Sequence, residues 1–274
     1  HPPSIARRQR QMCIRDRIGQ EQTPEEYIQS LVEVFRSVRD VLADDGTLWV
    51  NIGDSYYNYR PGKGQSYPKQ SVSKTKQDLP EQCNKRGNKL EGLKEKDLIG
   101  IPWMLAFALR SDGWYLRQDI IWHKPNPMPE SVRDRCTKSH EYIFLFSKNR
   151  KYYYDNEAIK EPVKQDWGTR NRTNGKYHNE GTGLQPHSGL TKSYTTKNKR
   201  SVWTVTTKPY KGAHFAVFPT DLIEPCIKAG SEEGDVVLDP FMGSGTTAVV
   251  SKSLGRHYIA VSYTHLRAHE TEQH

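Results

Sequence analysis

The sequence predicts an α/β protein built on a parallel sheet, and two patterns carry this prediction. Segments with the apolar period of a helix, about 3.6 residues, alternate with short apolar runs typical of buried strands. Towards the end of the chain, an apolar run enters a turn with two glycines, and a helical run leaves it. At 274 residues, the chain is long enough for one large domain with its own core or for two small domains.

The first helix is signalled at its start. Thr23 is expected to cap it, Pro24 suits the first helical position, and Glu26 would complete a capping box. Apolar residues then keep helical spacing, at positions 28, 31, 35, 38 and 42, until Gly46 ends the pattern. The run "TLWVNIGDSYY" at 47–57 follows and predicts a buried strand that leads into a polar turn.

A second helix and two strands are predicted in the middle of the chain. Asp97 is expected to cap the helix, which should end at Gly113. Its expected core residues are Trp103, Leu105, Phe107 and Leu109. Apolar runs at 114–124 and 140–148 predict strands that are joined by a Pro-rich extended loop.

The last part of the chain continues the alternation of helices and strands. Strands are expected at 151–155, 201–205, 235–239 and 257–261. Helices are expected from Thr220 to Lys228, closed by Gly230, and over 245–254, ended by Gly255.

The chain is basic, with 41 Lys and Arg against 32 Asp and Glu and a pI of about 9.2. Residues 58–96 hold ten basic side chains against four acids, and residues 160–211 hold eleven against three. Both segments lack apolar periodicity, which predicts long loops. They are either solvated insertions or basic arms beside a nucleic-acid groove. Aromatic rings that can stack on bases favour the second interpretation: Tyr56, Tyr57, Tyr59, Tyr67, Trp167, Tyr177 and Tyr194.

The cysteines and the apolar runs exclude several classes of protein. The four cysteines lie far apart without a C-x-x-C pair, so neither a zinc site nor a disulfide framework is expected. No metal site is predicted. A reducing cytoplasm fits this cysteine usage. The sequence shows no apolar run of about 18 residues and no recognisable secretory signal.

The two ends differ from the rest of the chain. Residues 1–17 carry five Arg and one Asp without periodicity, and residues 262–274 interrupt an apolar strand. These ends are either frayed termini or, as we expect, non-native tails that resemble translated sequencing-adapter sequence. In the second case the natural protein continues in both directions, and 18–261 is its native part.

The glycine-containing turn indicates a ligand site. Gly243 and Gly245 allow the backbone to approach a ligand closely, and the following helix start offers N–H groups to an anion. A P-loop is excluded because no Gly-Lys-Ser/Thr follows the second glycine. The nicotinamide-dinucleotide fingerprint is also excluded, because Ala248 stands where its third glycine belongs.

The string "DPFMGSGTT" at 239–247 resembles the S-adenosylmethionine motif of amino-directed DNA methyltransferases, which modify adenine N6 or cytosine N4. The cofactor's carboxylate suits the backbone N–H groups, its ammonium suits Asp239 or carbonyl oxygens, and its apolar parts suit Phe241. Phe215 lies in "AHFAVFP", a family segment that approaches the cofactor from the other side, and is either a ligand contact or core. The implied cofactor-binding residues are Asp239, Pro240, Phe241, Gly243, Ser244, Gly245, Thr246, Thr247 and Phe215.

The resemblance covers about residues 18–261 and includes the order of the segments. The cofactor half follows the catalytic half, as in the circularly permuted beta class of this family. The resemblance therefore implies a Rossmann-like S-adenosylmethionine-dependent methyltransferase sheet, permuted and truncated at both ends, with basic insertions at about 58–96 and 160–200. The second insertion is the candidate for reading the DNA sequence.

Two departures from the family pattern concern its chemistry. The catalytic Ser- or Asp-Pro-Pro-Tyr motif is expected shortly before Ile18 but is absent, and His1-Pro2-Pro3-Ser4 is taken as coincidence. Ser262 replaces an acidic residue that binds the cofactor ribose in the family, and a hydroxyl replaces only part of a carboxylate's hydrogen bonding. Catalytic residues are therefore not assigned, and this chain is expected to be incomplete and inactive.

Other polar residues have a functional and a structural interpretation. The strand end at 122–127 is expected either to contact DNA or form the rim of the base pocket, or to be a rigid Pro-rich turn. Asp54 either caps a helix or turn or belongs to the active-site rim, whereas His140 and Glu141 are expected to be structural. The predicted DNA-binding residues are Trp122, His123, Lys124, Asn126, Lys197, Lys199 and Arg200.

The resemblance implies a site-specific methyltransferase that acts on an exocyclic amine of double-stranded DNA, with cytosine N4 slightly favoured over adenine N6. Its expected setting is a prokaryotic or phage cytoplasm, with a cognate restriction endonuclease as functional partner and no membrane. Two alternatives stay open: a catalytically dead DNA-binding fragment, and a methyltransferase for RNA or a small molecule.

Overall fold

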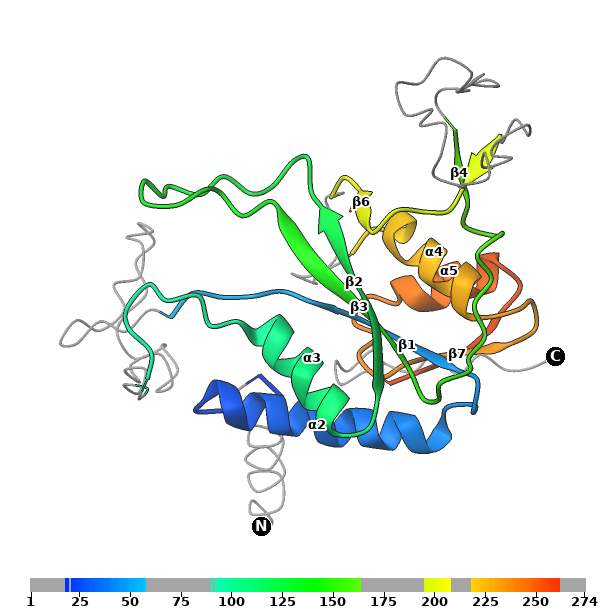
Figure 1. Ribbon diagram of the computed structural model, residues 1–274, viewed down its shortest axis with the longest axis horizontal. Helices are drawn as coiled ribbons and strands as arrows, with labels where there is room; N and C mark the ends of the chain where they lie inside the picture. The colour runs from blue at the N-terminus through cyan, green and yellow to red at the C-terminus, as the bar shows by residue number, and fades with distance from the viewer. Residues whose placement is uncertain are drawn as a thin grey trace, which may run out of the picture. The chain divides into compact units, whose positions relative to one another are not determined.

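The computed structural model describes residues 18–19, 21–57, 90, 92–163, 195–207 and 218–261 (Figure 1). The chain divides into two compact units. Unit 1 extends to Trp122 and includes Lys138–Tyr152, and unit 2 contains His123–Thr137 and the chain from Tyr153 onward. The predicted tails, Phe215, Ser262 and most of the two basic segments lie outside the described residues.

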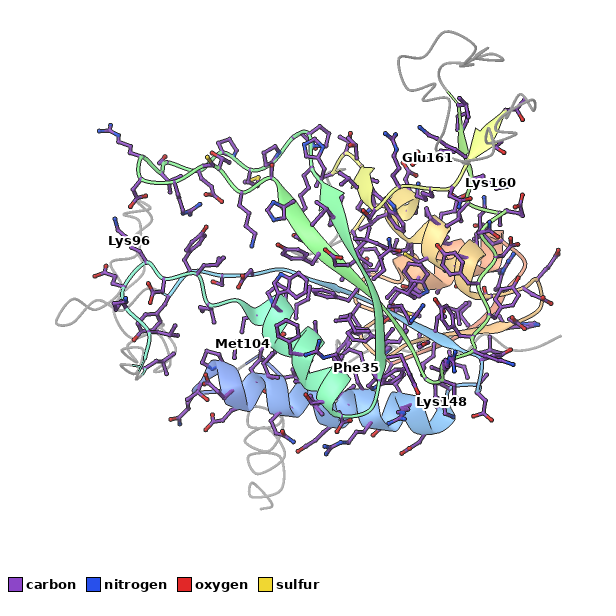
Figure 2. The ribbon with its side chains drawn as sticks, viewed as in Figure 1. Phe35, Lys96, Met104, Lys148, Lys160 and Glu161 are labelled. Atoms are coloured by element: carbon purple, nitrogen blue, oxygen red, sulfur yellow. The ribbon has the colours of Figure 1, made fainter. Side chains whose placement is uncertain are left out.

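Helix α2 (Pro24–Val41) begins as its sequence predicts. Thr23 Oγ1 accepts a hydrogen bond from the Glu26 N–H at 3.1 Å, and Pro24 occupies the first turn. The capping box differs from the expectation, because Glu26 accepts from the Gln22 N–H at 3.0 Å rather than from Thr23. The buried face follows the predicted period and consists of Ile28, Leu31, Val32, Phe35 and Val38 (Phe35 is labelled in Figure 2).

The sheet of unit 1 contains β1 (Thr47–Ile52), β2 (Tyr115–His123) and β3 (His140–Ser147), with β3 between the other two. Strands β1 and β3 are antiparallel, with Val50 opposite Phe144. The expectation of a parallel sheet is therefore wrong for this pair of strands. A pattern of alternating helices and strands indicates which segments are extended, but it does not determine the direction in which distant strands pair. Lys148, just beyond β3, donates to the Leu42 carbonyl at 2.8 Å and anchors the turn before β1 (Figure 2).

Helix α3 (Ile101–Ser111) has a different cap from the one predicted. Asp54 Oδ1 accepts from the N–H groups of Gly100 at 3.0 Å and Ile101 at 3.1 Å. Asp97 instead closes a local turn by accepting from the Lys94 N–H at 2.8 Å. The prediction that Asp54 caps a helix is thus confirmed. The cap comes from a residue 46 positions before Gly100. Such a long-range cap leaves no local signal in the sequence.

The core prediction for α3 is correct on one face of the helix only. Leu105 and Leu109 are 1% and 0% exposed. Trp103 is half-buried and meets the Tyr142 and Phe144 rings edge-on, with centroids 5.6 and 5.2 Å apart. Phe107 is 45% exposed, so its assignment to the core is wrong. It lies under the Arg110 guanidinium, 4.9 Å from the ring centroid.

Unit 2 contains the parallel strands that the sequence predicts. Strand β7 (Val236–Asp239) leads through the glycine turn into α5 (Thr246–Ser253) and then to β8 (His257–Ala260), and β7 and β8 pair in parallel. Helix α4 (Thr220–Gly230) precedes them as expected. The described residues of this unit also contain β4 (Glu161–Pro162), β5 (Thr196–Lys197) and β6 (Val202–Thr204). The expected strand at 151–155 is absent from this described segment, where the Asp155 N–H donates to the Ala229 carbonyl at 2.9 Å.

Two searches of the described ranges bear on membranes and metals. None of the helices there combines the length and the apolar character that crossing a bilayer requires. The same ranges hold no group of three or more His, Cys, Asp or Glu side chains placed to share a metal ion.

Candidate cofactor site

The glycine loop, residues 240–245, follows β7 at the carboxyl ends of two parallel strands. Asp239 lies opposite Ala260 in the β7–β8 register, so both strands end at the same edge. The Val261 N–H donates to the Asp239 carbonyl at 3.0 Å, and the Met242 N–H donates to the Val261 carbonyl at 3.2 Å. These bonds tie the loop to the end of β8. Open α/β sheets place their ligands at this edge.

Asp239 holds the two ends of the loop together. Its Oδ1 accepts from the Phe241 N–H at 2.8 Å, and its Oδ2 accepts from the Thr247 hydroxyl at 2.5 Å. The sequence suggested this carboxylate as the acceptor for a cofactor ammonium, and the geometry adds a positioning role within the chain. Because a carboxylate offers about four acceptor sites, these two bonds leave capacity for a ligand donor.

The two loop glycines are required by backbone conformation rather than by crowding. Gly243 has φ 52° and Gly245 has φ 86°, both in the left-handed region. A Cβ added at Gly243 would lie 3.8 Å from the Phe241 carbonyl oxygen, and one at Gly245 would lie 4.0 Å from Met242 Sδ. Both distances are ordinary contacts. A side chain would therefore fit, but the backbone would be strained.

Gly245 is also the N-cap of α5, and it lacks a side chain that could satisfy the first N–H groups of the helix. Within the described residues no other side chain caps this helix. The adjacent hydroxyls of Ser244 and Thr246 lie 3.1 Å apart, and Phe241 is 42% exposed. The loop thus combines polar backbone groups with an accessible ring. This set of groups fits a zwitterionic ligand with an apolar part.

The strand end at 122–127 is more structural than its sequence suggested. Trp122 is 3% exposed, so it is a core residue rather than a DNA contact. His123 Nδ1 lies 3.2 Å from Thr204 Oγ1. The Asn126 amide donates to the Thr207 carbonyl and accepts from the Thr207 N–H, each at 3.1 Å. Asn126 therefore fixes this loop beside the chain that follows β6. Lys124, two residues earlier, is half-buried.

The three predicted basic contacts near residue 200 lie on or after the small β4–β5 ribbon. Lys197 lies opposite Glu161 in this ribbon. Arg200 Nε donates to Glu161 Oε2 at 3.1 Å, and Lys199 Nζ lies 5.0 Å from the centroid of the Trp203 ring (Glu161 is labelled in Figure 2). Arg200 and Lys199 therefore have structural partners, whereas Lys197 stays a predicted DNA contact.

The Glu161–Arg200 pair makes a pH-dependent contribution to stability. Burial raises the pKa of the Glu161 carboxyl, but hydrogen bonds from Arg200 and its positive charge outweigh burial, so the pKa is lowered overall. This stabilisation is fully present at pH values above the pKa of Glu161 in the unfolded chain, about 4.3. It is lost as the pH falls through the lower pKa that Glu161 has in the folded protein.

We expect Glu161→Gln to reduce the free energy of unfolding by roughly 0.5–1 kcal/mol at pH 7, because the pair is partly exposed. Below both pKa values, the variant and the parent should have the same stability. Urea unfolding at several pH values measures this. Glu157→Gln is the control, since its pair with Lys160 involves a carboxylate side chain that is 70% exposed. A Glu161→Gln effect that does not change with pH would contradict the assignment.

Comparisons with known proteins agree with this geometry. The PvuII DNA methyltransferase, described as cytosine-N4-specific, has a similar fold, with a TM-score of 0.55 at 16% identity over 87% of this chain and 67% of that one. A putative DNA modification methylase from Thermus thermophilus, solved with S-adenosyl-L-methionine, gives a TM-score of 0.50 at 20% identity over 87% and 72%. The chain therefore shares the fold of these two methyltransferases, and its glycine loop lies at the sheet edge where open α/β folds bind their ligands.

Two sequence relatives and a family model identify the family to which the chain belongs. The Type II methyltransferase M.SmaI of Serratia marcescens is 48% identical over 244 residues, which cover 89% of this chain and 72% of that protein. M.Cfr9I of Citrobacter freundii is 46% identical over 251 residues, covering 90% and 71%. A family model described as DNA methylase matches residues 2–271. The chain belongs to this DNA methylase family, whose members act on base N6 or N4 amines. The predicted family, fold class and cofactor are confirmed, and the permutation and truncation stay predictions.

Proposed function

We propose that the protein transfers a methyl group from S-adenosylmethionine to an exocyclic amine at a specific site in double-stranded DNA. Cytosine N4 is slightly favoured over adenine N6 as the target, because of the overall resemblance of the sequence to this family. The observation that carries the proposal is the glycine loop at the carboxyl edge of β7 and β8, in a chain 48% identical to a Type II methyltransferase. A prokaryotic cytoplasm and a cognate restriction endonuclease as functional partner belong to the same proposal.

The loop residues would hold the cofactor through complementary charges. The N–H groups at the start of α5 suit its carboxylate, Asp239 suits its ammonium, and Phe241 suits its apolar part. When bound, the cofactor supplies a methyl group on a positively charged sulfur. The contribution of the loop is positioning, because an in-line approach of the amine requires the methyl group to be held in one orientation. The target base must leave the stacked duplex to reach it.

The test of this proposal is methyl transfer from tritium-labelled S-adenosylmethionine to duplex DNA. Transfer to duplex DNA, with the label recovered on cytosine N4 or adenine N6, would support the proposal and identify the base. Label on RNA but not on DNA would favour the RNA alternative. Salt-dependent duplex binding without cofactor binding or transfer would favour a DNA-binding fragment, for which the absent catalytic motif is the specific observation.

DNA affinity should depend on Lys197 through phosphate contact. We expect Lys197→Ala to weaken duplex binding uniformly across DNA sequences and to reduce the slope of log affinity against log salt by roughly 1. Fluorescence anisotropy at several salt concentrations measures the slope. Lys228→Ala in α4 is the matched control, because its ammonium lies 2.6 Å from Glu224. Equal slopes for both variants would contradict a role for Lys197.

A further inference from the structure

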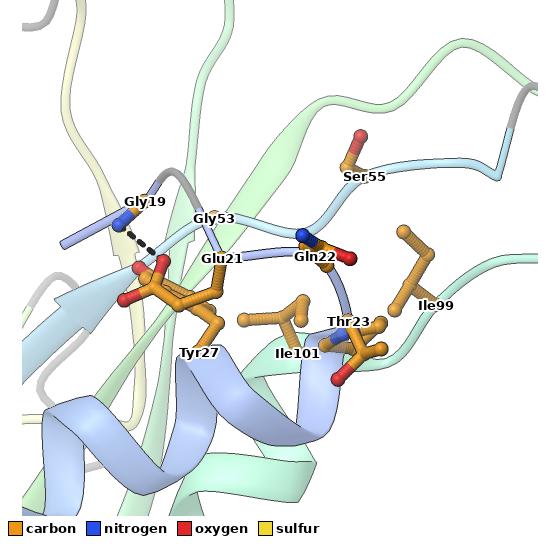
Figure 3. A pocket seen from close by; sticks show the side chains of 10 residues that line it. Gly19, Glu21, Gln22, Thr23, Tyr27, Gly53, Ser55, Ile99 and Ile101 are labelled. Atoms are coloured by element: carbon orange, nitrogen blue, oxygen red, sulfur yellow. Dashed lines mark hydrogen bonds between the residues drawn. The ribbon is translucent and has the colours of Figure 1, made fainter. Parts of the chain in front are cut away.

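Met128 lies on an arm of unit 2, residues 124–137, and its side chain is 84% exposed. No other large apolar side chain among the described residues is as exposed. By contrast, Ile99 and Ile101 belong to the lining of a pocket in unit 1, together with Tyr27 (Figure 3). A single exposed apolar residue is common on protein surfaces. Met128 differs from such a residue because the arm is braced on both sides of it.

The first brace joins Asn126 to Thr207, in the chain after β6. The Asn126 amide donates to the Thr207 carbonyl and accepts from the Thr207 N–H, each at 3.1 Å. The Thr207 hydroxyl also donates to the Asn126 carbonyl at 3.5 Å. Because these bonds join one pair of residues in several directions, they fix the position and the orientation of the arm two residues before Met128.

The second brace is the ion pair of Glu130 and Arg135. Arg135 Nη1 lies 2.6 Å from Glu130 Oε2, and it also donates to the Cys136 carbonyl at 3.3 Å. The two side chains are only 30% and 29% exposed, so salt screens this pair less than a fully exposed one. The pair closes the chain between residues 130 and 135 into a loop that begins two residues after Met128.

Prolines on both sides restrict the backbone at Met128. The ring of a proline fixes its φ at about −65°, which applies to Pro127 and Pro129. Pro129 also disfavours the helical region for the residue before it, which is Met128. The side chain is therefore held out by a restricted backbone, and binding there costs little further ordering of the chain.

The surroundings of Met128 suit nucleic acid better than another protein. Asn126, Ser131 and Arg133 are exposed polar residues of the same arm. The centre of a protein interface is a contiguous apolar patch, which this arrangement does not provide. The Arg133 guanidinium suits a phosphate. Methionine is unbranched, its thioether makes favourable contacts with aromatic rings, and it is among the side chains that proteins insert between base pairs.

We infer that Met128 is a wedge that enters between two stacked base pairs of bound duplex DNA and kinks the duplex there. The inference rests on the proposed function, which supplies duplex DNA as the partner. Separating a base step is costly, so an apolar side chain can do it only if its own backbone does not yield. The two braces and the prolines meet this requirement. Because a thioether carries no charge, the role of Met128 differs from that of a phosphate contact.

The experiment compares two short fluorescein-labelled duplexes of one sequence, one intact and one carrying a bulge of unpaired adenines. The bulged duplex is already kinked and partly unstacked, so a wedge enters it without opening a base step. We expect the full chain to bind the bulged duplex roughly tenfold more tightly, as measured by fluorescence anisotropy. Met128→Ala should bind both duplexes with similar affinity, whereas Met128→Leu should keep the preference.

A second measurement reports the kink itself. Energy transfer between dyes at the two ends of the intact duplex should rise when the parent chain binds, and it should rise much less with Met128→Ala at saturation. Ser131→Ala is the matched control, because Ser131 is an exposed residue of the same arm. It should keep both the preference and the kink. Arg133→Ala should weaken binding to the two duplexes equally, as the loss of a phosphate contact does.

The inference is overturned if the parent binds both duplexes equally, if Met128→Ala keeps the preference, or if Ser131→Ala loses it too. Sedimentation tests the other partner class: loss of self-association in Met128→Ala, with DNA binding unchanged, would assign the side chain to a second copy and also overturn it. Binding to neither duplex would contradict the proposed function as well. If the chain binds both duplexes equally and transfers methyl groups to DNA, only the wedge inference fails.

Discussion

Gly245→Val should weaken S-adenosylmethionine binding by roughly 10- to 100-fold. Gly245 has φ 86°, and forcing a β-branched residue into this region costs about 1–3 kcal/mol. The variant can avoid this cost by turning the backbone to negative φ. That rotation redirects the N–H groups at the start of α5, which are the groups we assign to the cofactor carboxylate. Isothermal titration calorimetry with S-adenosylmethionine measures the effect.

The same unit provides a close control at Gly234. Gly234 has φ 91° and, like Gly245, has no atom closer than about 4 Å to an added Cβ, but it lies in the turn before β7. Gly234→Val should therefore cost similar stability without weakening cofactor binding by the folded protein. Gly245→Asn should recover part of the affinity, because Asn tolerates the left-handed region. Equal loss of binding in the two valine variants would indicate a general effect of instability and contradict the assignment.

Asp54→Ala should lower the free energy of unfolding by roughly 1–3 kcal/mol. Asp54 Oδ1 accepts from three backbone N–H groups, those of Ser55, Gly100 and Ile101, at 2.9–3.1 Å. Removing the carboxylate leaves the two helix N–H groups, which are part-buried, without this acceptor. It also releases α3 from the turn after β1. Equilibrium urea unfolding, followed by circular dichroism, measures the change.

Asp97→Ala separates this long-range cap from a local one. Asp97 accepts a side-chain hydrogen bond from one exposed N–H, that of Lys94, so its removal should cost no more than about 0.5 kcal/mol. Asp54→Asn keeps one carbonyl oxygen as acceptor and should recover most of the loss, since Asn caps helices nearly as well as Asp. If Asp97→Ala were as destabilising as Asp54→Ala, the assignment of the cap to Asp54 would be wrong.

The candidate cofactor site shows how far local patterns reach. The succession of a strand, a glycine loop and a helix was predictable, because apolar runs and glycines depend directly on backbone conformation over a few residues. The double role of Asp239 was not, because its partners Phe241 and Thr247 are identified only once the loop is folded. The position of Trp122 at a strand end predicts a DNA surface, whereas its 3% exposure depends on what packs around it.

The amino-acid sequence alone determined the α2 helix with its Thr23 cap, the parallel β7–β8 pair with its glycine loop, and the methyltransferase class. The helix cap and the glycine loop depend on residues close together along the chain, and the motif at 239–247 that indicates the class is equally local. Tertiary structure decided the antiparallel β1–β3 pairing and the cap of α3 by Asp54. The physical reason is distance along the chain: these features join segments tens of residues apart, and only packing selects which distant partner satisfies a buried strand edge or a helix end.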